Sequence, residues 1–96
     1  MRTQITAIHF SATDILQEFA ETEVQRLLKF ADNITNCEIE FTFNKQEKRA
    51  NIHVSLDGTV LNASSVSEDF QKSVVLAVDK LETQVKKHKD KIHAKH

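Results

Sequence analysis

The chain has 96 residues, of which 40% are hydrophobic and 28% are charged, and its formal net charge is −1. This length allows one domain with one core, and the sequence holds neither an apolar run of the ~20 residues that a membrane span needs nor a hydrophobic signal-peptide core after its polar N-terminus. The net charge excludes a globally basic nucleic-acid-binding protein, and the single cysteine, Cys37, excludes an internal disulfide. We expect one cytoplasmic domain over residues 1–96, with no membrane partner.

Charge is distributed unevenly along the chain. Residues 71–96 contain seven lysines and three acidic residues, which gives +4, whereas residues 1–70 contain six basic and eleven acidic residues, which gives −5. A locally basic surface near the C-terminal end of the sequence therefore stays compatible with the net charge.

The first half of the sequence predicts a strand, a helix and a second strand. The first strand is expected over residues 2–10. Thr13 is the expected N-cap of a helix that continues to about Phe30, because apolar residues recur there at helical spacing. Strict alternation of apolar and polar residues from Cys37 to Asn44 predicts a strand with one buried face, which makes Cys37 a buried structural thiol rather than a nucleophile.

The second half predicts two more strands and a long helix. The expected elements are a polar hairpin loop over 45–49, strands over 50–57 and 59–66, and a helix from 67 to 91. Asp57–Gly58 is a signal for a type I′ hairpin between the two strands. Ser67 is the expected N-cap of the last helix.

The predicted order is β-α-β-β-β-α, an α+β fold with a four-stranded mixed sheet. The first strand should lie parallel to the second, because a helix joins them, and the hairpin-connected strands should be antiparallel. Both helices need to bury an apolar stripe and the sheet has one strongly apolar face, so we expect both helices on that face, a dsRBD-like arrangement. The other sheet face is then open and polar, with Glu38, Glu40, Thr42, His53 and Ser55.

Catalytic chemistry is poorly supported by the sequence. Glu38 and Glu40 share one face of a strand with His53 expected opposite, but on an open sheet we interpret them as solvated side chains rather than an acid/base pair. No glycine-rich phosphate loop, Ser/His/Asp order or paired-cysteine motif is present. We expect no enzyme, no catalytic residue, no metal or other cofactor, and no small-molecule substrate.

The basic end of the last helix allows two interpretations. One is a capped surface helix with solvated lysines, and the other is a helix that offers its basic end to phosphates. The chain has no Tyr or Trp to stack on unpaired bases, so structured RNA, recognised by shape and phosphates, suits it better than single strands.

Three runs of the sequence, 62–70, 77–82 and 84–91, resemble the ribosome hibernation-promoting factor family, which includes the ribosome-associated translation inhibitors. In that family an Ala-Ser segment ends the fourth strand, as in Ala63-Ser64 here, and an acidic turn starts the last helix. The series Asp-Lys-Leu-Glu and Lys-His-Lys closes that helix, and this chain has it in 77–82 and 84–91. The first half agrees more loosely, and the similarity is to the family's short form.

The resemblance implies a bacterial factor of stress or stationary phase that binds the small ribosomal subunit, contacting 16S rRNA and ribosomal proteins. It would bind between head and body, block the tRNA and mRNA sites and inhibit translation. As a short form, without the long form's linker and C-terminal dimerisation domain, it would be a monomer off the ribosome and would not join two ribosomes by itself. The rRNA-binding residues that the resemblance implies are Arg26, Lys29, Lys80, Lys86, Lys87, His88, Lys89 and Lys91.

Two alternatives stay open from the residues. One is a generic module that binds another structured RNA, which competition with tRNA for small subunits would distinguish. The other is a protein-interaction domain that uses the open sheet face, whose binding would survive ribonuclease treatment.

Overall fold

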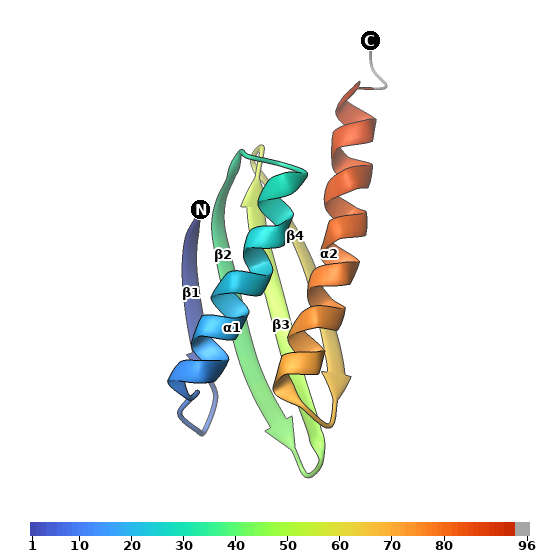
Figure 1. The fold of residues 1–96 in the computed structure, drawn as a ribbon. Helices are drawn as coiled ribbons and strands as arrows, with labels where there is room; N and C mark the ends of the chain where they lie inside the picture. Colours follow the sequence, from blue (N-terminus) through green and yellow to red (C-terminus); the bar gives the residue numbers. More distant parts are fainter. Residues whose placement is uncertain (94–96) are drawn as a thin grey trace.

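The computed structural model describes residues 1–93, with side chains described to residue 90. Its elements are β1 (Arg2–Ala7), α1 (Asp14–Val24), the 3-10 helix η1 (Gln25–Lys29), β2 (Ile34–Asn44), β3 (Glu47–Leu56), β4 (Thr59–Ser67) and α2 (Phe70–His93). The strand order in the sheet is β1-β2-β3-β4 (Figure 1). β1 runs parallel to β2 and the other pairs are antiparallel. The predicted β-α-β-β-β-α fold is therefore confirmed.

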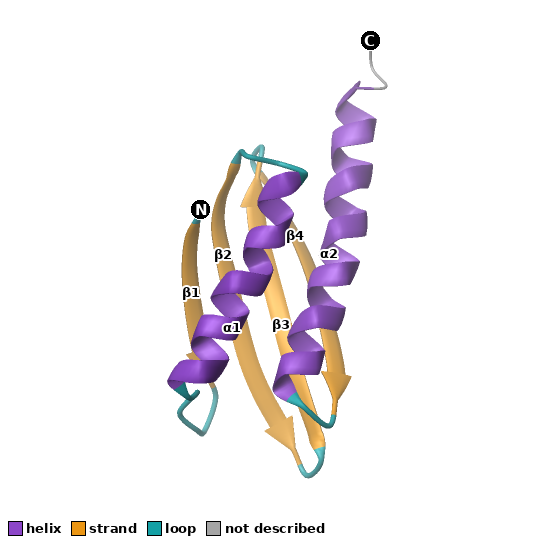
Figure 2. Cartoon of the chain, in the orientation of Figure 1, coloured by secondary structure: helices purple, strands orange, loops and turns teal. Residues whose placement is uncertain are grey.

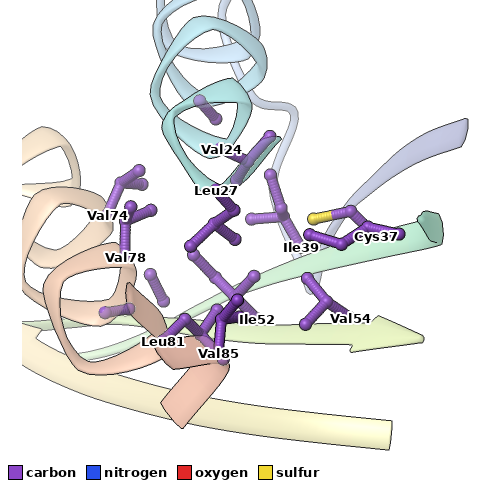
Figure 3. Packing of buried hydrophobic residues seen from close by; sticks show 14 of the residues in the cluster. Val24, Leu27, Cys37, Ile39, Ile52, Val54, Val74, Val78, Leu81 and Val85 are labelled. Carbon is purple, nitrogen blue, oxygen red and sulfur yellow. The ribbon is translucent and has the colours of Figure 1, made fainter. Parts of the chain in front are cut away.

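Both helices cover the same face of the sheet and leave the other face open (Figure 2). The core lies between the helices and the covered face of the sheet. It is made of the inward side chains of β2 and β3 and the apolar stripes of the helices (Figure 3). In α2 that stripe is Val74, Ala77, Val78, Leu81 and Val85, all with no exposed surface. The alternation in β2 and β3 and the spacing of three and four in α2 are the sequence patterns that require this arrangement.

The helical segment after Thr13 changes its form before it ends. The Leu16 backbone N–H donates to Thr13 Oγ1 at 3.1 Å, which confirms Thr13 as the N-cap. The α-helix ends at Val24 and the 3-10 helix η1 continues to Lys29. The single helix expected to Phe30 is therefore an α-helix followed by a 3-10 helix. Tighter 3-10 turns are common at the C-terminal ends of helices. Here the tight turn keeps Leu27 fully buried.

The two hairpins differ in how well the sequence predicted them. Asp57 and Gly58 have φ angles of 52° and 71°, which confirms the type I′ turn between β3 and β4. The loop expected over 45–49 is wrong, because β2 and β3 pair as far as Asn44 and Glu47 and leave a two-residue turn. Lys48 and Arg49 belong to the ladder, and Lys45 takes a φ of 58° to close the turn. A run of charged residues is typical of a loop, but here most of it is paired in the sheet.

Two strand ends also differ from expectation. β1 ends at Ala7 rather than at residue 10, since His9 adopts a φ of 67° and leaves the strand direction. Phe10 then turns toward the helices' side, where its ring lies 5.1 Å from that of Phe70 and 5.4 Å from that of Phe43. β2 begins at Ile34, earlier than the predicted Cys37.

Ser67 is not the N-cap of α2, because it is still paired with Lys48 at the end of β4. Asp69 takes that role, with its Oδ1 accepting the Gln71 backbone N–H at 3.0 Å. Ser67 Oγ instead accepts the Asp69 N–H at 3.2 Å and lies 2.7 Å from the hydroxyl of the buried Ser73. An apolar stripe locates a helix better than it locates the first residue of that helix.

α2 has 24 residues and continues past the end of the sheet (Figure 1). At a rise of about 1.5 Å per residue it is roughly 36 Å long, which accounts for the extents of 48 × 21 × 19 Å. No helix in the described part of the chain is long and apolar enough to cross a membrane.

Candidate nucleic-acid interface

The basic residues of α2 lie on two flanks of the helix, on either side of its buried stripe. Lys80 and Lys87 are seven residues apart, which places them on one flank. Lys80 Nζ donates to the Ser64 carbonyl of β4 at 2.8 Å, so this flank faces β4. Lys87 is exposed two turns later, and within the described residues it has no hydrogen bond or ion pair.

β4 is an edge strand, and α2 covers part of its open edge. Besides the bond from Lys80 to Ser64, Gln84 Nε2 donates to the Asn62 carbonyl at 2.7 Å. Unpaired carbonyls at a sheet edge invite pairing with another chain, and side chains that cap them reduce that risk. Lys80 therefore has a contact within the fold, nearly two turns of helix before the basic end begins at Lys86.

The opposite flank of α2 faces η1 and meets Arg26. Arg26 Nη2 lies 2.8 Å from Asp79 Oδ1 and 2.5 Å from Glu82 Oε1, and Nη1 is paired with Glu23. The hydrogen bonds to Glu23 and Asp79 raise the pKa of Arg26 above its usual range. Three carboxylates thus surround one guanidinium, and the charge of this cluster is −2. Lys29, one turn further along η1, is exposed.

Two contacts join the basic end of α2 to loops of the fold. Lys86 Nζ lies 4.5 Å from the centre of the Phe30 ring, a cation–π geometry. His88 Nε2 lies 3.1 Å from Asp57 Oδ2 in the β3–β4 turn. The same aspartate accepts a hydrogen bond from the Asn33 side chain. These contacts connect α2 to both loops at this end of the sheet.

Four of the eight predicted site residues lie together after the last buried residue of α2, beside the β3–β4 turn that His88 contacts: Lys86, Lys87, His88 and Lys89. Arg26, Lys29 and Lys80 lie nearer the sheet, and Arg26 and Lys80 have partners within the fold. Lys91 is in α2, but its side chain lies outside the described residues. RNA binding by all eight stays a prediction.

Asp79 and Glu82 are the site residues that sequence reasoning missed. The i,i+3 spacing of Glu23 and Arg26 on one helix predicts their ion pair, but no local signal connects Arg26 to a helix more than 50 residues later.

The open sheet face carries the residues expected there. Glu38 is directly opposite His53 in the ladder, and Glu38, Glu40 and His53 are all exposed. Among the described residues, no three His, Cys, Asp or Glu side chains lie close enough together to hold a metal ion. Cys37 belongs to β2, and its side chain is buried in the core on the other face of the sheet. Desolvation raises the pKa of its thiol to about 12, as expected of a structural thiol.

Residues 3–93 match the family model described as "Sigma 54 modulation protein / S30EA ribosomal protein". A ribosome hibernation promoting factor of Azotobacter vinelandii is 33% identical over 93 residues, which cover 95% of this chain and 85% of that relative. A solved ribosomal subunit interface protein of Coxiella burnetii has a TM-score of 0.88 and 36% identity, covering 94% of this chain and 99% of that one. The N-terminal domain of Protein Y of Thermus thermophilus has a TM-score of 0.83 and 26% identity, with 92% and 99% covered.

Proposed function

This chain belongs to the Sigma 54 modulation protein / S30EA ribosomal protein family, as its motifs indicated, and from that membership we propose that it is a ribosome hibernation factor. The family is ribosome-associated and is not an enzyme family. We propose that the protein acts in the cytoplasm, as a monomer off the ribosome, and binds the small ribosomal subunit between head and body. There it would exclude tRNA and mRNA and inhibit translation in stress or stationary phase.

The observation that carries this proposal is the cluster of basic side chains at the C-terminal end of α2, where Lys86 and Lys87 are exposed. A net charge of −1 gives the whole molecule no long-range attraction to RNA. Binding to rRNA must therefore depend on a local cluster of positive charge, and Lys86, Lys87 and Lys89 form one within a single turn. The side chains of Lys86 and Lys87 are exposed, so phosphates can reach them from solvent.

The proposed mechanism is steric. The protein, whose principal-axis extents are 48 × 21 × 19 Å, would occupy the space that tRNA and mRNA need, and phosphate contacts would hold it in place. No cofactor is required, because the bound protein only excludes other ligands. The open polar sheet face on the other side of the molecule is free to face solvent or a ribosomal protein.

The test is sedimentation of purified small subunits with the protein at about 50 mM and about 200 mM salt. We expect co-sedimentation that weakens steeply with salt and is displaced by initiator tRNA. Binding that tRNA does not displace would favour the generic RNA-binding alternative. Absence of binding at the lower salt concentration would refute the proposal and would favour a protein partner for the open sheet face.

A further inference from the structure

We propose that Arg26 is a positioning residue that fixes the direction of the basic end of α2, and that it does not itself contact phosphate. This inference rests on the proposed function, in which that end binds rRNA. It separates the predicted site residues into those that bind and one that aligns the others.

The geometry shows Arg26 as a connection between two helical segments. It projects from η1 and contacts Glu23 at the end of α1, together with Asp79 and Glu82 of α2. Asp79 and Glu82 are three residues apart and therefore present their carboxylates on the same side of α2. One guanidinium thereby connects η1 to the side of α2 that carries both carboxylates.

The charge of the cluster argues against a phosphate contact. Both terminal nitrogens of Arg26 already have carboxylate partners, Nη2 with two of them. A phosphate would approach a site of net charge −2. It would also have to displace carboxylates that belong to the same chain and therefore stay close to the guanidinium. A salt bridge within a network of this kind is more persistent than an isolated surface pair.

The position of the cluster explains why it controls the basic end. Val85 is the last residue of α2, among those described, that is fully buried. Beyond it the described contacts with the rest of the fold are Lys86 on Phe30 and His88 with Asp57. Phe30 is the C-cap of η1, the segment that carries Arg26. If η1 moves away from α2, the ring that supports Lys86 moves with it.

Removal of the guanidinium would leave three carboxylates facing one another across the two helices. Their mutual repulsion would separate η1 from α2 and tilt the basic end, while the buried stripe would keep the domain folded. We therefore expect the variant to bind rRNA more weakly because the basic end of α2 is misoriented, and not because a contact with phosphate is lost.

Salt dependence of binding distinguishes a positioning residue from a phosphate contact. Each phosphate contact contributes about −0.7 to −0.9 to the log–log slope of affinity against salt. We expect Arg26→Gln to weaken binding to purified small subunits roughly 3- to 10-fold with an unchanged slope. Lys87→Gln, an exposed control with the same loss of charge, should make the slope shallower by one contact. A slope that changes equally in Arg26→Gln would overturn the proposal.

A double-mutant cycle provides the second arm. In an Asp79→Asn/Glu82→Gln background the partners on α2 are already neutral, so Arg26→Gln should weaken binding by less than about 2-fold more. If Arg26 contacted phosphate, its loss would cost as much in that background as in the wild-type protein. Thermal unfolding of each variant checks that the domain is folded.

A third measurement does not involve the ribosome. In the free protein, NMR should show a ring-current shift of the Lys86 methylene protons next to Nζ, because the Phe30 ring lies 4.5 Å from Nζ. We expect Arg26→Gln to reduce this shift and Lys29→Gln, on the same segment, to preserve it. A shift that persists in Arg26→Gln would refute the positioning role. If the wild-type protein did not bind subunits, the proposed function would fail, while this shift would still decide whether Arg26 holds η1 against α2.

Discussion

Replacing Lys86, Lys87 and Lys89 together with Gln should remove most of the affinity for the small subunit without unfolding the domain. All three lie after Val85 in the last turns of α2, and none belongs to the buried stripe. Glutamine keeps helix propensity close to that of lysine. The substitution therefore changes charge at the proposed interface and little else.

The magnitude follows from the number of phosphates lost. At a slope of about 0.8 per contact, one contact contributes roughly 6-fold in affinity at 0.1 M salt, so three contribute about 200-fold. The slope itself should become shallower by about 2 to 3. The cost in stability should stay near 0.5–1 kcal/mol, mainly the cation–π contact of Lys86 with Phe30.

The assay is sedimentation binding to purified small subunits over a series of salt concentrations, with urea unfolding of the free proteins alongside. Glu38→Gln/Glu40→Gln, on the open sheet face, is the control for a change of charge remote from the proposed interface. A triple variant that binds with wild-type affinity and slope would show that these lysines are solvated side chains of a surface helix. The reasoning about the basic end of α2 would then be wrong.

Three further predictions concern stability. Leu81 is fully buried beside Val85 and Ile52 (Figure 3), so Leu81→Ala should lower the free energy of unfolding by about 2–5 kcal/mol in urea titrations; a loss below 1 kcal/mol would contradict the packing. A methyl group on Gly58 would meet no atom within 4 Å, but its φ of 71° disfavours other residues, so Gly58→Ala should cost roughly 1 kcal/mol, and a rise in melting temperature would be inconsistent with the turn. Burial raises the pKa of Cys37 from 9.0 to about 12, so the unfolded chain releases this proton first as pH rises. The contribution of this thiol to the free energy of unfolding is fully present below pH 9 and falls toward pH 12 by up to about 1.4 kcal/mol per pH unit. Cys37→Ala should lack this loss. If the free energy of unfolding of both proteins fell in parallel above pH 9, the prediction would be refuted.

The sequence by itself determined the elements and the layer arrangement, because those depend on local rules. Alternation in 37–44 and 50–57 defined the buried face of two strands, and the stripe from Val74 to Val85 defined the inner face of α2. Asp57–Gly58 determined its turn because few residues adopt positive φ. One apolar sheet face and two amphipathic helices then allow only helices packed together on that face.

Errors occurred where a local signal competed with strand pairing. The polar residues of 45–49 are typical of a loop, yet Lys48 and Arg49 are held in the ladder by their partners on β2. Ser67 is a good capping residue, but its pairing with Lys48 keeps it in β4 and passes the cap to Asp69. Strand pairing depends on the residues of the partner strand, so the residues of one segment alone do not predict it.

Only the tertiary structure decided what each basic residue of the site does. In the sequence Arg26, Lys80 and Lys87 are equivalent positive charges. Folding gives Arg26 a partner 53 residues away and Lys80 a carbonyl 16 residues away, whereas Lys87 stays exposed. Charge is a property of the residue, but the availability of that charge depends on which side chains the fold brings within a few ångströms of it.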